Sequence, residues 1–122
     1  MWERALEHLA PAIERSLGRY DEESVLRAIL NRDMQLWLAV AEQPIAAAVT
    51  RISIWPTGLK TCRVLFAGGK EMKRWTYMMD GIGEWAKSRD CRYLEVEGRP
   101  GWERILGWNK ESIELVKDLT DG

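Results

Sequence analysis

The sequence has few of the residues that build metal and redox sites. It contains one histidine, His8, and two cysteines, Cys62 and Cys91. These residues cannot form a Cys/His zinc site of recognised ligand spacing, so we expect no metal cofactor. They provide no disulfide framework either, and we expect free thiols in a reducing compartment, the cytoplasm of the cell that makes the protein.

An excess of charge of one sign and a long apolar run are also missing. The chain has 18 basic and 19 acidic residues among 122, a formal net charge of −1. This balance gives no electrostatic reason to expect a nucleic-acid partner. No apolar run approaches the roughly 20 residues that span a bilayer, and charges interrupt the first ten residues, so we expect neither a membrane span nor a signal peptide. A chain of this length is expected to form one domain, residues 1–122, around one core.

The first third of the chain is typical of two helices. Apolar residues recur at helical spacing over 2–17 and again over 25–30. Pro11 predicts a kink or a restart in the first helix. Asp21 is a candidate N-cap of the second helix, while Gly18 and Asn31 are candidate left-handed residues after each helix.

The middle of the chain changes to the period of strands. Three apolar segments, 35–41, 45–55 and 60–67, predict an antiparallel meander with a turn at Pro56-Thr57-Gly58. A long amphipathic helix is predicted over 71–88, and a strand over 91–97. A strand, a long helix and another strand predict a right-handed crossover, so 60–67 and 91–97 should run parallel.

Glycines mark the long helix and the segments that follow it. Gly81 and Gly83 lie inside the helix, where close packing against the sheet is the favoured explanation. Downstream, "GRPGWERILGW" predicts a short helix that ends at Gly107, after which Trp108 should be buried on the sheet. The C-terminal "NKESIELVKDL" fits a strand or a helix, and we favour a strand.

The predicted element order resembles the GNAT superfamily of acetyl-CoA-dependent N-acetyltransferases, over about residues 20–119. The segments that carry the resemblance are "LWLAVAEQPIAAAV", "TCRVLFAGGKEM", "WAKSRDCRYLEVEGR" and "GWERILGW". More narrowly, the short motifs "AGG", "WAK", "GRPGW" and "GW" resemble those of small GNAT-like proteins encoded by tailed bacteriophages. The genes of those proteins often lie among head and tail genes. The resemblance implies an α+β (α/β) fold with a mixed sheet, two N-terminal helices and a long central crossover helix.

The resemblance implies that acetyl-CoA would bind where the third strand meets the long helix. The family places the pyrophosphate on backbone amides of a Gln/Arg-x-x-Gly-x-Gly/Ala loop, at the positive end of the helix dipole. This chain has "FAGGKEM", so the candidate cofactor residues are Ala67, Gly68, Gly69 and Lys70. The loop lacks the leading Gln/Arg and the spaced glycines. The alternative is a glycine turn that a first-turn acid caps. If acetyl-CoA does bind at this loop, Gly69→Asp should abolish cofactor binding with little effect on folding.

Two glutamates are the candidate catalytic residues. Many family members have a tyrosine acid four residues before the glycine of the Gly-aromatic pair, and this chain has Glu103 there. Glu97, near the carboxyl end of the strand 91–97, is the preferred base, ahead of Glu95. The alternation of "YLEVEGR" also explains both strand glutamates as its polar face.

Two functions therefore stay open. The first is a phage-type GNAT-fold protein with a degenerate acetyl-CoA site, acting as a structural or protein-interaction component of a phage head or tail. Its seven tryptophans are core or interface material, which favours a protein partner or self-association. The alternative is an acetyl-CoA-dependent N-acetyltransferase that acts on an amine of a small molecule or a protein.

Overall fold

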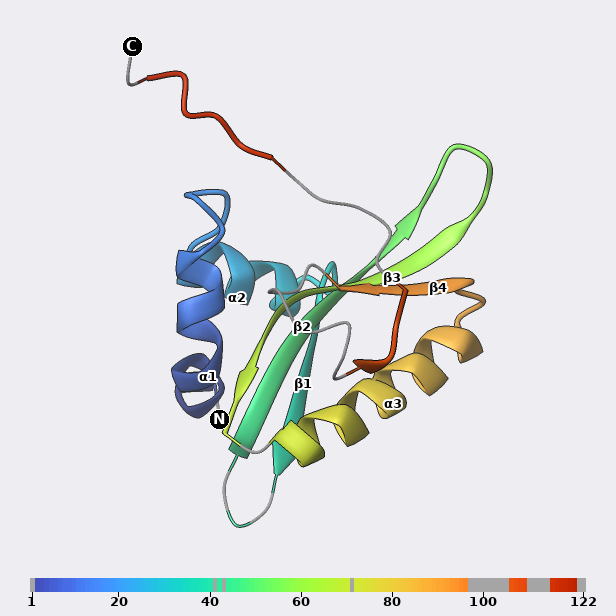
Figure 1. Ribbon diagram of the computed structural model, residues 1–122, viewed down its shortest axis with the longest axis horizontal. Helices are drawn as coiled ribbons and strands as arrows, with labels where there is room; N and C mark the ends of the chain where they lie inside the picture. Colours follow the sequence, from blue (N-terminus) through green and yellow to red (C-terminus); the bar gives the residue numbers. More distant parts are fainter. Residues whose placement is uncertain are drawn as a thin grey trace.

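The computed structural model describes residues 2–40, 42, 44–70, 72–96, 106–109 and 115–120, without the side chains of residues 44 and 72–75. The described residues form three helices and four strands, arranged as in Figure 1: α1 (Trp2–Glu14), α2 (Glu22–Leu30), β1 (Gln35–Val40), β2 (Pro44–Ile54), β3 (Lys60–Gly69), α3 (Met72–Ser88) and β4 (Tyr93–Val96). The predicted short helix and final strand lie mostly outside these residues, so they stay predictions.

The four strands form one mixed sheet in the order β1-β2-β3-β4. The pairs β1–β2 and β2–β3 are antiparallel, whereas β3 and β4 are parallel and joined through α3. The predicted meander and crossover are therefore confirmed, and α3 continues unbroken through Gly81.

Helices cover both faces of the sheet. α1 and α2 pack on one face and α3 packs on the other (Figure 1). The core under α1 and α2 contains Ala5, Leu9, Ile13, Val25, Met34, Ala47, Val49 and Phe66. The core under α3 contains Ala46, Ala48, Cys62, Val64, Ala67, Met78, Met79, Ile82 and Ala86. Burial of these two apolar faces is the main force that holds the layers together.

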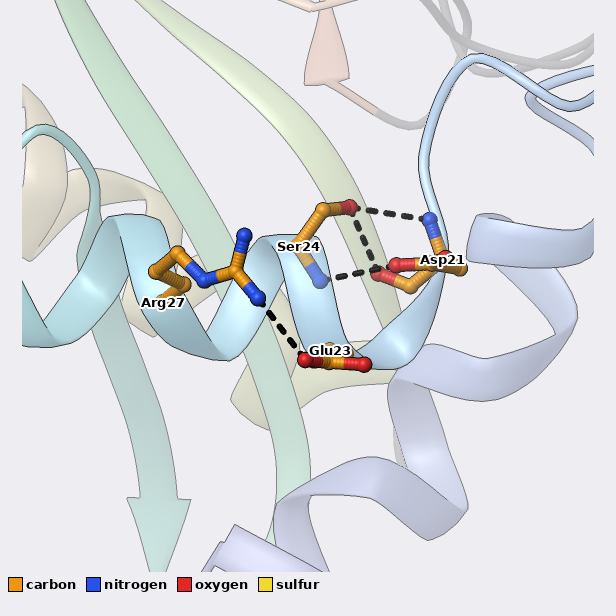
Figure 2. Close-up of polar contacts among 4 residues, drawn as sticks. All are labelled: Asp21, Glu23, Ser24 and Arg27. Atoms are coloured by element: carbon orange, nitrogen blue, oxygen red, sulfur yellow. Dashed lines mark hydrogen bonds and ion pairs between the residues drawn. The ribbon is translucent and has the colours of Figure 1, made fainter.

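The N-terminus of α2 carries the predicted cap. The carboxylate of Asp21 accepts a hydrogen bond from the Ser24 amide at 2.7 Å, and the Asp21 amide donates to the Ser24 hydroxyl at 3.0 Å (Figure 2). One turn later Arg27 pairs with Glu23 at 2.7 Å on the exposed side. The two hydrogen bonds between Asp21 and Ser24 satisfy backbone donors that would otherwise be free at the start of the helix.

The helix ends differ in part from the sequence predictions. α1 runs through Pro11 without a restart, because Pro11 is exposed and the buried face of Ala5, Leu9 and Ile13 is continuous. Gly18 adopts a left-handed φ of 80° as predicted. After α2, however, Asn31 has a φ of −82°, and Arg32 takes the left-handed conformation with a φ of 65°.

The two glycines inside α3 do not share the predicted packing role. A β-carbon on Gly83 would lie 3.5 Å from Leu94 Cδ2, an ordinary contact with β4. A β-carbon on Gly81 would meet nothing within 4 Å. The expectation of close packing is therefore wrong for Gly81, which lines a hollow of about 440 Å³ beside β1.

Candidate functional site

β3 has a bulge close to the last residue that the structure describes as paired with β4. The described parallel pairing runs as far as Val64 opposite Val96, the last described residue of β4. The next β3 residue, Leu65, is an additional residue in the register with β2, which passes from Thr50–Val64 to Val49–Phe66. A bulge bends its strand and ends pairing locally. Beyond it, no strand in the described part of the chain pairs with the β4-facing edge of residues 65–69.

The predicted glycine loop is the end of this strand. β3 continues two residues past the predicted boundary at Ala67, and Gly68 and Gly69 pair with Ala47 and Ala46 of β2. A β-carbon on Gly68 would clash with the backbone carbonyl of His8 in α1. One on Gly69 would lie 2.5 Å from Ala46 Cβ. Close packing therefore accounts for both glycines.

Lys70 connects β3 to α3. Its amide donates a hydrogen bond to the Ile45 carbonyl at 3.0 Å, so this amide is occupied within the protein. Its side chain is exposed, and α3 begins two residues later at Met72. The first turn of a helix presents free amides and the positive end of the dipole. An anion at this junction would therefore meet the first turn of α3 and the Lys70 ammonium group.

The two candidate catalytic residues, Glu97 and Glu103, lie outside the described residues and stay predictions. Glu95 is described: it is half-buried on β4, opposite Arg63. Of the downstream segment, Leu106 packs against the core under α3 and Gly107 has a left-handed φ of 69°. Trp108, which the sequence predicts to be largely buried, is partly buried.

The two cysteines are free thiols in an environment that disfavours nucleophilic chemistry. Burial, with a smaller contribution from nearby Cys91, raises the pKa of the Cys62 thiol to about 11, and a hydrogen bond with Thr50 opposes the shift. Burial also raises the pKa of Cys91. Because the thiolate is the nucleophile, neither residue is an activated one near neutral pH. Their proximity agrees with the pairing of β3 and β4.

A row of charged residues crosses three strands, and its alignment was not predicted from the sequence, although Glu95 alone was considered as a base. Arg51, Arg63 and Glu95 lie opposite one another on β2, β3 and β4. Arg51 Nη1 donates to the Tyr20 hydroxyl at 3.0 Å, and Arg63 Nε is buried without a hydrogen-bond partner among the described residues. A sequence signal exists, because each residue is the charged member of an alternating strand segment, "TRISI", "TCRVL" and "YLEV".

The described residues contain no group of three or more His, Cys, Asp or Glu side chains that could hold a metal ion. None of the helices in the ranges that the structure describes is long and apolar enough to cross a membrane.

Comparison by sequence finds no matching protein-family model and no matching curated protein. The fold, however, is similar to solved acetyltransferases. A predicted acetyltransferase from Clostridium acetobutylicum, solved with acetyl-CoA, superposes with a TM-score of 0.67 and 16% identity, over 100% of this chain and 94% of that chain. A GNAT family acetyltransferase from Staphylococcus aureus gives a TM-score of 0.65 and 17% identity, with 97% and 91% covered. An aminoglycoside 6'-N-acetyltransferase from Acinetobacter haemolyticus gives 0.63 and 16%, with 96% and 92% covered. With β3, the crossover α3 and β4 arranged as described, the chain has the GNAT acetyltransferase fold.

Proposed function

We propose that the protein is an acetyl-CoA-dependent N-acetyltransferase that acts on an amine of a small molecule or a protein. The observation that carries the proposal is the bulge of β3 at Leu65, beyond which no described strand pairs with the β4-facing edge of residues 65–69, directly before α3. An open strand edge binds extended ligands through their amide groups. The pantetheine arm of acetyl-CoA is such a ligand, because it is linear and contains amides.

The junction of β3 and α3 suits the other end of the same cofactor. Phosphate groups are favoured at a helix N-terminus, and the exposed Lys70 side chain adds a positive charge there. Since packing explains Gly68 and Gly69, we assign the phosphate contacts to the first turn of α3 and to Lys70. Ala67, Gly68 and Gly69 would contribute the strand edge.

The chemistry requires a base for the acceptor amine and an acid for the departing thiolate. We assign these roles to Glu97 and Glu103, on the resemblance given above. In the sequence Glu97 directly follows β4, which pairs with β3 up to the start of the proposed cofactor edge. The fold similarity to acetyltransferases, one of them solved with acetyl-CoA, supports this function over a purely structural one.

Calorimetric titration with acetyl-CoA tests the proposal. We expect saturable binding of one acetyl-CoA per chain, weakened about tenfold in Lys70→Glu through loss of one charge contact and gain of a repulsive one. The matched control is Lys117→Glu, which makes the same charge change in the exposed terminal segment. Absence of binding at millimolar acetyl-CoA, or equal weakening in both variants, would refute the assignment.

A second candidate function is that of a structural or protein-interaction component. The narrower resemblance given above would place this component in a phage particle. Two exposed apolar features favour it. The β2–β3 hairpin projects beyond the body and carries exposed Ile54 and Trp55 (Figure 1). The terminal segment 115–120 also extends away from the body, with Leu115 and Leu119 exposed. Large exposed apolar side chains are typical of interaction surfaces.

Light scattering coupled to gel filtration tests this second candidate. Concentration-dependent self-association that Trp55→Ser removes, in a protein that binds no acetyl-CoA, would favour the interaction function. A monomer that binds acetyl-CoA would exclude it as the principal one.

A further inference from the structure

The charged row of Arg51, Arg63 and Glu95 faces the side of the sheet that carries α1 and α2. The neighbours of Arg63 along β3, Cys62 and Val64, pack in the core under α3. Leu94 and Val96, on either side of Glu95, pack against the same core. Since successive side chains of a strand alternate between faces, Arg63 and Glu95 point to the opposite face. Arg51 shares that face, because it lies directly opposite Arg63 and reaches Tyr20.

The row lies where the cover of the two helices ends. Tyr20 stands between α1 and α2 and packs edge-on against Phe66, with ring centroids 5.3 Å apart. Beyond the row, the next pair of residues on the same face is Thr61 and Tyr93. Trp55 covers this end, since its Nε1 donates to the Thr61 hydroxyl at 2.9 Å. Aromatic side chains therefore flank the row on both sides.

The charges of the row are not matched within the described part of the chain. Arg63 Nε is buried and has no hydrogen-bond partner. Glu95 lies directly opposite Arg63, yet their side chains form no ion pair within 4.0 Å. Among the described residues, the ion pair found is the one between Arg27 and Glu23 on α2. Buried polar groups are almost always hydrogen-bonded, so an unpartnered guanidinium nitrogen indicates a ligand, an ion or a water at this position.

The arrangement of Arg51 beside Arg63 favours an anion over a water. The two arginines are directly opposed cross-strand neighbours, and like charges in this position repel each other. Within the described residues, the one hydrogen bond of the Arg51 side chain is a neutral one, to the Tyr20 oxygen. That bond leaves the Tyr20 hydroxyl hydrogen free to donate. Paired guanidinium groups are the usual ligands of carboxylate and phosphate groups, because their fork of donors matches the oxyanion geometry.

We propose that Arg51 and Arg63 form a binding site for an oxyanion, a carboxylate or a phosphate, with Tyr20 as a further donor. The oxyanion belongs to the acceptor amine, whose ammonium group Glu95 faces across the row. The acceptor class is thus an amine that also carries an acidic group. The assignment of the oxyanion to an acceptor amine rests on the proposed acetyltransferase function, whereas the anion site itself does not.

The side-chain Nε–Hε resonance of Arg63, followed by NMR, gives a direct test. The probes are inorganic phosphate and acetate, titrated separately in the absence of acetyl-CoA, with sodium chloride at matched ionic strength as the reference. We expect a saturable shift with phosphate or acetate that chloride does not produce. The stronger probe identifies the acidic group. No specific shift with either anion would overturn the proposal.

Variants establish which residues hold the anion. Arg51→Gln, followed at the Arg63 resonance, should weaken phosphate binding about tenfold, because one charge-assisted contact is lost. Arg63→Gln should weaken phosphate binding to the same extent. This variant is followed through the stabilisation against unfolding that phosphate confers. Arg89→Gln is the control, because Arg89 stacks over Trp85, outside the row. Should Arg63→Gln fail to fold, Arg63→Lys keeps the charge, and weaker phosphate binding is expected there. If Arg63 instead pairs with a carboxylate of this chain, its variants lose stability and phosphate adds none, which would also overturn the proposal.

A variant of Glu95 tests whether the bound oxyanion belongs to an acceptor amine. Phosphoethanolamine should bind more tightly than inorganic phosphate, and Glu95→Gln should abolish this preference while leaving phosphate binding as tight or tighter. Equal affinities in the native protein would remove the amine from the proposal. Acetyl-CoA also carries phosphates, so the phosphate titration is repeated with acetyl-CoA present. Persistence of the Arg63 shift separates this site from the cofactor, and its loss would contradict the assignment to the acceptor.

Discussion

Gly68 of β3 lies directly against the backbone carbonyl of His8 in α1, with no room for a β-carbon between them. This contact joins the first helix to the end of the strand that leads into α3. The glycine is therefore needed for the packing of two layers. Any role of the same segment in cofactor binding must use what this packing leaves accessible, the strand edge and the Lys70 side chain.

Substitutions of two glycines should have opposite effects. Gly68→Ala should lower the free energy of unfolding by about 1–3 kcal/mol, the usual cost of forcing an added group into a packed site. Gly81→Ala should raise it by about 1 kcal/mol, because Gly81 lies inside α3 with open space around its Cα. Urea denaturation measures both. Equal stability of the two variants would contradict the contact with His8.

The expectation that Gly69→Asp leaves folding intact is corrected by the same geometry. A β-carbon on Gly69 would lie 2.5 Å from Ala46 Cβ and 2.8 Å from the Ile45 carbonyl oxygen. We expect Gly69→Asp to unfold at a lower temperature than the native protein. Loss of cofactor binding in this variant would consequently not locate the site, which is why Lys70→Glu is the better test.

Thr50 connects a buried polar network under α3. Its side chain is fully buried, accepts a hydrogen bond from Trp37 Nε1 at 3.0 Å and donates to Gln35 Oε1 at 2.9 Å. Thr50→Val should reduce the free energy of unfolding by about 1–3 kcal/mol, because both partners lose their hydrogen bond. Thr57→Val, at the exposed turn of the β2–β3 hairpin, is the control and should have little effect. A Thr50→Val protein with the same free energy of unfolding as the native protein would show that the network contributes nothing to stability.

The raised pKa of Cys62 predicts how stability depends on alkaline pH. The folded protein holds the thiol proton up to a pKa of about 11, above the ordinary value of 9.0. The resulting stabilisation is fully present below pH 9 and is lost as the pH rises through the folded pKa. Denaturation between pH 8 and 11 should show this decline, and it should be shallower in Cys62→Ala. Rapid reaction of Cys62 with a thiol reagent in the folded protein at pH 8 would contradict its burial.

The cap of α2 predicts the opposite dependence at acidic pH. Hydrogen bonds from Ser24 lower the pKa of Asp21 below its ordinary value of 3.8. The folded-state pKa is depressed, so the contribution of the cap is present above 3.8 and lost as the pH falls through the lowered value. Asp21→Ala should therefore lower the Tm at pH 7, and this difference in Tm should shrink as the pH falls below 3.8. Glu22→Ala, in the same turn, is the control. A Tm difference for Asp21→Ala that is independent of pH would contradict this account.

The element order was predictable from periodicity, because the helices and strands bury one face or lie fully in the core. The start of α2 was also predictable, since Asp21 and Ser24 interact locally. Other features depend on contacts between distant segments. The extension of β3 through Gly69 follows from pairing with β2 and from the approach of His8, which no local pattern encodes. The left-handed residue after α2 is Arg32, although Asn31 has the higher intrinsic preference for that conformation.

The candidate site was predictable only in outline. The resemblance placed a cofactor at the junction of β3 and α3, but the bulge at Leu65 arises from the register with β2. The charged row was not predictable, because each member occupies an ordinary polar position of its own strand. Its meaning depends on the register that aligns Arg51, Arg63 and Glu95 across the sheet.

Hydrogen exchange of the β3 amides, measured with and without acetyl-CoA, tests the central claim most directly. If the cofactor pairs with the β4-facing edge of β3 beyond the bulge, exchange within residues 65–69 should slow on binding, while residues 61–64, already paired on both sides, should change little. Unchanged exchange over 65–69 at saturating acetyl-CoA, or protection confined to another part of the chain, would contradict the proposed site.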